Sequence, residues 1–184
     1  MSGEKSPVHI VKQKRDDALL RFAQASVEDQ KKAELNYAEA EVKVAKVTLA
    51  CATTENERRR GEVEVAKAEV KVAKVTLACA TTENERRRGE VEVAKAEVEV
   101  AKAEVKVANV TSACATTENE RRRGEVEVAK AEVAVCQKEM CVARLNENSA
   151  EIAFFESYLE TLLKNVQAGM HMILFSCASY SSYL

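Results

Sequence analysis

The sequence of 184 residues contains one proline, five glycines, no tryptophan and only 4% aromatic residues. Glycine and proline are common in turns, and aromatic side chains fill much of a large hydrophobic core. Their shortage argues against a globular domain that encloses a pocket. The chain is rich instead in Ala, Glu, Lys, Val and Arg. That composition is typical of long helices and coiled coils and predicts an all-α protein.

Charge is abundant but balanced, with 28 basic and 30 acidic residues and a net charge of −2. This balance gives no overall attraction to nucleic acid or to an acidic membrane. The first residues are polar and lack the apolar segment of a secretory signal, and no apolar run approaches the ~20 residues of a membrane span. The six cysteines form no disulfide-scaffold pattern. We therefore expect a cytoplasmic protein.

One block of 24 residues organises the chain. VTLACATTENERRRGEVEVAKAEV occupies residues 47–70 and again 75–98, and it returns at 110–133 with Ser112 in place of leucine. The spacings are 28 and 35 residues, both multiples of seven. Seven is odd, so in a strand each repeat would move its apolar residues to the opposite face. In a helix seven residues make nearly two turns, so equivalent positions form one stripe. The period therefore predicts helix despite the many valines.

The heptads carry two apolar seams, which lie roughly 150° apart on a helix of 3.5 residues per turn. A Glu column separates them on one side, and a column of Lys separates them on the other. Two contact faces predict at least two neighbouring helices, or one helix and a lipid or ligand surface. The seam residues that we expect to mediate association are Val42, Val44, Leu49, Cys51, Val70, Val72, Leu77, Cys79, Val98 and Val100.

Each repeat interrupts its own apolar pattern with TENERRRG, which places Asn and Arg on seam positions. Glu55 with Arg59, and Arg58 with Glu62, have the i,i+4 spacing of helical ion pairs, so the segment is compatible with a continuous helix. Because the heptad phase is unbroken, we favour one long coiled-coil-like rod over residues 16–144. The alternative is an up-and-down bundle broken at these segments, since Thr54 and Glu57 have the spacing of a capping box.

The two ends differ from the repeats. Residues 1–15 are expected to be a flexible lead-in, and residues 169–184 a disordered tail. Between the rod and the tail, residues 149–168 predict a short amphipathic helix, capped by Asn148 or Ser149 and stopped at Gly169. Its larger apolar side chains are expected to pack on one side; they are Ile152, Phe155, Leu159, Leu162 and Val166.

No arrangement of residues indicates an enzyme, a metal site or a cofactor. His9 and His171 are isolated near opposite ends of the chain, and the repeated cysteines are too far apart along a helix to share a metal. The most distinctive charges are three arginine triplets, which could dock an anionic partner although glutamates flank them. They are Arg58, Arg59, Arg60, Arg86, Arg87, Arg88, Arg121, Arg122 and Arg123.

We therefore expect a structural or interaction protein: a coiled-coil spacer or scaffold that forms a homo-oligomer or binds a partner helix through the Val, Ala and Leu seams. The first alternative is reversible, peripheral contact of the same faces with lipid. The weaker alternative is docking of an anionic partner on the arginine triplets. Nucleic acid is a disfavoured partner, because no aromatic residues alternate with the arginines.

Overall fold

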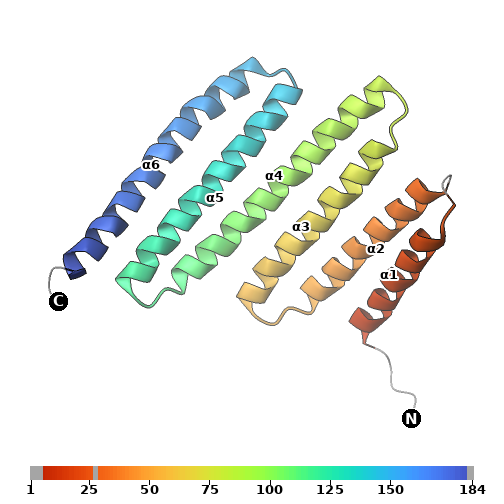
Figure 1. Cartoon of the computed structure of the whole chain (residues 1–184), viewed down its shortest axis with the longest axis horizontal. Helices are drawn as coiled ribbons and strands as arrows, with labels where there is room; N and C mark the ends of the chain where they lie inside the picture. The colour runs from red at the N-terminus through yellow and green to blue at the C-terminus, as the bar shows by residue number, and fades with distance from the viewer. Residues whose placement is uncertain (1–5, 27–28, 182–184) are drawn as a thin grey trace, which may run out of the picture. The chain divides into compact units, whose positions relative to one another are not determined.

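The computed structural model describes residues 6–26 and 29–181, with side chains as far as Met170, and α-helix is its only regular secondary structure (Figure 1). The helices are α1 (Pro7–Gln24), α2 (Gln30–Ala50), α3 (Glu55–Ala78), α4 (Glu83–Ala113), α5 (Glu118–Leu145) and α6 (Ser149–Ser181). The expectation of an all-α fold is confirmed.

The chain divides into two compact units, Met1–Val100 and Ala101–Leu184. In the first unit α2 contacts both α1 and α3, whereas the described residues of α1 and α3 do not contact each other. Successive helices run in opposite directions (Figure 1). Ion pairs link adjacent helices: Lys46 reaches Glu69 between α2 and α3 at 2.8 Å, and Lys74 reaches Glu97 between α3 and α4 at 3.0 Å. These helices therefore pack side by side, each against the next along the chain.

In the second unit α5 and α6 form an antiparallel pair (Figure 1). The chain reverses between them at Glu147, which has a positive φ of 56°. The other described non-glycine residues have negative φ values. Asn148 then caps α6, accepting a hydrogen bond from the Glu151 backbone N–H at 3.2 Å. The C-terminal part of α4 is tied to α5 by Lys102 and Glu139 at 3.1 Å.

The single helix expected over residues 16–144 is wrong. The chain leaves helix after Gln24, Ala50, Ala78 and Ala113 and begins a new helix each time. The up-and-down alternative is confirmed in its main feature, since the helices are interrupted at residues 51–54, 79–82 and 114–117, where each TENERRRG segment begins. Each of these segments supplies the first turns of a helix. The physical reason is that folding back lets one seam pack on the other within a single chain, which a lone extended helix cannot do.

The ends of the chain also differ from expectation. Helix α1 begins at Pro7, a favoured residue for the first helical turn, so residues 7–15 are helical. Helix α6 does not stop at Gly169 but continues to Ser181. Gly169 lies instead against α5, where an added Cβ would come 2.8 Å from Val126 Cγ2. The expected tail is thus helical over residues 169–181, and residues 182–184 and 1–5 lie outside the described residues.

The buried apolar core is thin and consists mostly of small side chains. Among the described side chains its members are Ala38, Val63, Ala66, Ala68, Val70, Val98, Ala101, Ala103, Val126, Cys136, Ala143 and Leu162. Larger apolar side chains remain exposed on α1 and α6, including Leu20 at 59% and Phe154 at 63%. Alanine and valine bury little apolar area each, so the helix contacts gain little hydrophobic free energy per residue.

Candidate functional site

The repeated feature of the structure is the turn that joins one repeat helix to the next. After α2, the Glu57 carboxylate accepts hydrogen bonds from the Thr53 backbone N–H at 3.0 Å, the Thr53 hydroxyl at 2.9 Å and the Thr54 backbone N–H at 3.1 Å. The Thr54 hydroxyl in turn accepts from the Glu57 backbone N–H at 3.2 Å. The capping box expected at Thr54 and Glu57 is confirmed.

The same turn is built twice more. Glu85 accepts from Thr81 and Thr82, and Glu120 accepts from Thr116 and Thr117, with distances between 2.9 and 3.1 Å. The first threonine of each pair adds two hydrogen bonds beyond the ordinary capping box. Sequence reasoning did not identify Thr53, Thr81 and Thr116; the signal was their fixed position four residues before the glutamate.

Hydrogen bonding to the charged form lowers the pKa of each turn glutamate. For Glu57 the largest cause is the Thr53 hydroxyl, and for Glu120 it is the Thr116 hydroxyl. For Glu85 the backbone N–H of Thr81 contributes most to the lowered pKa. The three carboxylates are therefore favoured in their ionised form by the folded turns.

A glycine brings the two helices of each repeat hairpin close together. A Cβ built on Gly61 would lie 2.9 Å from Leu49 Cδ1, and one on Gly89 would lie 2.8 Å from Leu77 Cδ1. Gly124 faces Ser112 in the third hairpin, where the Ser112 Cα itself would lie 2.8 Å away. These glycines were missed as contact residues, although each follows its partner by 12 positions in the sequence.

The predicted seam residues differ in how far the structure buries them. Val70 and Val98 are buried, and Cys51, at the C-terminal end of α2, is exposed. The others are half-buried: Val42, Val44, Leu49, Val72, Leu77, Cys79 and Val100. α2 uses both of its faces, since it contacts α1 and α3. These contacts lie within one chain, and association between chains is a separate question.

The C-terminal packing residues lie on the side of α6 that meets α5. Leu162 is buried at 4% exposure, and Ile152, Phe155, Leu159 and Val166 are half-buried. Cys136 of α5 is 1% exposed, and its thiol donates to the Phe155 carbonyl oxygen at 3.3 Å. Burial raises the pKa of the Cys136 thiol.

The arginine triplets occupy the first turns of α3, α4 and α5 and are largely neutralised there. Glu55 pairs with Arg58 at 3.2 Å and with Arg59 at 2.7 Å, and Arg59 also reaches Glu62. The expected pair of Arg58 with Glu62 is replaced by Arg58 with Glu55. Arg86 and Arg87 pair with Glu90 and Glu83, and Arg121 and Arg122 both pair with Glu118. The third arginines, Arg60, Arg88 and Arg123, are exposed.

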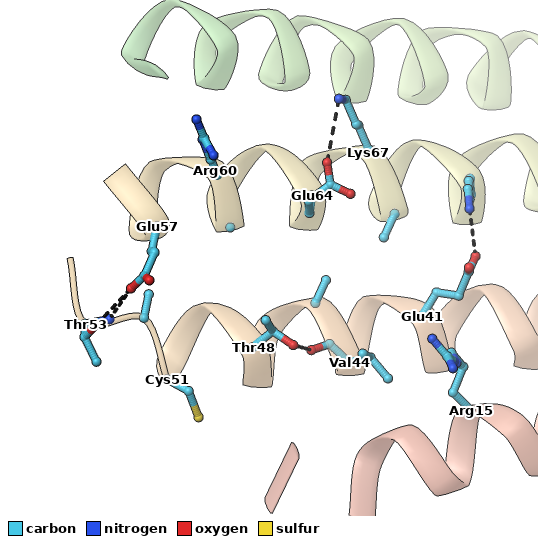
Figure 2. Close-up of a pocket in the computed structure, with 15 residues that line it drawn as sticks. Arg15, Glu41, Val44, Thr48, Cys51, Thr53, Glu57, Arg60, Glu64 and Lys67 are labelled. Carbon is cyan, nitrogen blue, oxygen red and sulfur yellow. Dashed lines mark hydrogen bonds and ion pairs between the residues drawn. The ribbon is translucent and has the colours of Figure 1, made fainter. Parts of the chain in front are cut away.

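An open groove of about 1060 Å³ follows the α2–α3 hairpin, with Arg15 of α1 at one end (Figure 2). Small residues line it, including Ala45 of α2, Ala52 of the turn, and Gly61 and Ala68 of α3. Charges of both signs line it, and several neutralise one another: Lys71 pairs with Glu41 at 3.0 Å, and Lys67 with Glu64 at 3.7 Å. The groove follows from the close approach of two helices with small side chains.

The remaining observations concern chemistry and membranes. Cys51, Cys114 and Cys141 are exposed free thiols, Cys79 is half-buried, and no three His, Cys, Asp or Glu side chains converge as a metal site in the part of the chain that the structure describes. Over the same residues, none of the helices has both the length and the apolar character needed to cross a membrane.

Comparisons with known protein families, with curated proteins and with solved structures gave no match to this chain.

Proposed function

We propose that the chain is a structural scaffold that acts by packing its helices against other helices, either those of further copies or those of a partner protein. The supporting observation is the thin core: the hairpins bury mainly alanine and valine, while Phe154, Tyr158, Leu163 and Met170 of α6 are between 44% and 63% exposed. Helices with such faces gain free energy when a further apolar surface covers them.

Electrostatic patterning supports the same proposal. The ion pairs of Lys46 with Glu69 and of Lys74 with Glu97 place a lysine of one helix opposite a glutamate of the next, at equivalent heptad positions. A further helix with the same heptad pattern could pair its lysines and glutamates with those of this chain in the same way. Exposed pairs contribute little stability but favour one register and orientation over others.

The test combines the mass of the reduced protein with its thermal unfolding at low and high micromolar concentration. Association stabilises the folded form by mass action, so mass and melting temperature are expected to rise together with concentration. A fluorescent synthetic peptide with the sequence of residues 53–79 tests binding of a partner helix, and a scrambled peptide of the same composition is the control. A constant monomer mass together with no preference for the repeat peptide would contradict the proposal.

A further inference from the structure

The first two repeat hairpins, α2–α3 and α3–α4, repeat the same sequence block and the same glycine–leucine contact. Residues 47–70 and 75–98 are identical in sequence, and the approach of Gly61 to Leu49 is reproduced by Gly89 and Leu77. The helix that precedes a turn would therefore meet the same contact residues on a second copy of the chain as it meets on its own. Contacts within one chain and contacts between two copies are chemically equivalent at these hairpins.

The repeat turns contain no residue that requires a turn. Ala52, Thr53 and Thr54 include neither glycine nor proline, and none of them has a positive φ. The heptad phase also continues through the turn, so a helix passing straight through residues 51–54 would keep the seams aligned. The turn between α5 and α6 is different, because Glu147 is held at a φ of 56°. Residues 51–54 and their equivalents can therefore adopt helical conformation without steric strain, which would open the turn.

Opening one turn in the first unit separates a single interface between helices. In the first unit α1 packs on α2 and α2 on α3, while the described parts of α1 and α3 do not touch. Opening the turn between α2 and α3 thus breaks that one interface and the hydrogen bonds to Glu57. The Glu55–Arg59 pair is retained, since both residues stay in helix. In return the backbone of residues 51–54 gains helical hydrogen bonds.

From these observations we infer that the association partner is a second copy of this chain, and that the copies exchange helices. One repeat turn opens into continuous helix in each copy, and the helices beyond it pack on the other copy through the contacts of the closed hairpin. This inference rests on the proposed scaffold function, for which it specifies the partner and the way in which the partners associate. Because the hairpin sequences are identical, exchange can also occur one repeat out of register and join more than two copies.

The test uses a proline that suits the closed turn and blocks the open one. Glu55 is the first residue of α3, where proline is favoured, and Thr54 has the extended φ of −112° and ψ of 154° that a residue before proline adopts. Thr117, before Glu118, is equally extended at −114° and 152°. In a continuous helix the same prolines would clash with the preceding turn. The full-length variant is E55P/E83P/E118P, and the matched control E55A/E83A/E118A loses the same ion pairs but permits helix.

Each reduced protein is refolded at high micromolar concentration and its mass is measured by light scattering after size exclusion. We expect dimers or larger species for the wild type and the alanine control, and a monomer of unchanged helicity for the proline variant. Equal association of all three proteins would overturn helix exchange and leave the scaffold proposal standing. A wild type that remains monomeric would also overturn it, and binding of the repeat peptide then decides the scaffold proposal separately.

Discussion

Gly124 of α5 packs directly against the backbone of Ser112 in α4, so closely that a Cβ on Gly124 would lie 2.8 Å from the Ser112 Cα. A Cβ built on Gly61 would lie farther from the facing backbone, at 3.3 Å from the Leu49 Cα. The third hairpin is thus the tightest, and it is the one in which serine replaces leucine. Because serine is smaller than leucine, the backbones of α4 and α5 can approach more closely at this position.

Replacing Gly124 by alanine tests this relationship. Alanine in a helix interior usually gains up to about 1 kcal/mol over glycine. At Gly124 the new methyl group would meet backbone, so we expect G124A to lower the melting temperature followed by circular dichroism. The matched variant G61A meets chiefly the movable end of Leu49 and is expected to unfold close to the wild type. A G124A protein more stable than G61A would contradict the close packing.

Removing the caps tests the turns. The triple variant T54A/T82A/T117A loses the hydroxyls that accept from the backbone N–H of Glu57, Glu85 and Glu120. Loss of a threonine cap costs about 1 kcal/mol in typical helices. We expect a lower melting temperature and faster amide exchange at residues 54–57 and their equivalents. The control is T48A/T76A/T111A, since those hydroxyls donate only within their own helices. Equal effects of the two triple variants would count against the caps.

The lowered pKa values of Glu57, Glu85 and Glu120 predict acid sensitivity. A carboxyl whose pKa is lower in the folded state stabilises that state above its ordinary pKa, and the contribution is lost as pH falls through the lowered value. We expect the melting temperature to fall on acidification below the ordinary glutamate pKa of 4.5. The variant E57Q/E85Q/E120Q should be less stable at neutral pH and should lose less on acidification. Parallel pH profiles for the two proteins would argue against this role.

Two adjacent leucines test the α5–α6 contact. Leu162 is 4% exposed and Leu163 is 44% exposed, although they share one helix. Truncating a buried leucine to alanine costs about 2–5 kcal/mol. Because a thin interface can partly close over the space, we expect L162A to cost about 2–3 kcal/mol. L163A is expected to remain within about 0.5 kcal/mol of the wild type. Chemical denaturation monitored by circular dichroism measures both, and similar losses would show that α6 packs differently.

The sequence allowed the helices and their two-faced character to be predicted, because a period of seven in Val, Ala and Leu fits helix and does not fit strand. The capping box at Thr54 and Glu57 was also readable, as was the apolar side of α6 around Leu162. These features depend on spacing along the chain, which the sequence states directly.

The reversal of the chain was harder to predict. Ala52, Thr53 and Thr54 lack turn residues, and the heptad phase passes through them unbroken, so local preference does not separate a rod from a hairpin. The choice depends on contacts distant in sequence, such as Gly61 with Leu49 and Lys46 with Glu69. The end of α6 could not be predicted for a related reason: a glycine at position 169 is typical of a helix stop, whereas Gly169 provides space for Val126 within the helix.

The most direct test of the account is the distance between residues 46 and 69 within one chain. Spin labels would replace Lys46 and Glu69 in a protein whose six native cysteines have been substituted. Dilution with unlabelled chains and isolation of the monomer restrict the measured distance to a single chain. The hairpin, with Lys46 and Glu69 paired at 2.8 Å, predicts a separation below roughly 20 Å, about twice the spacing of packed helix axes. A separation of about 35 Å, the length of 23 residues of straight helix, would contradict the account.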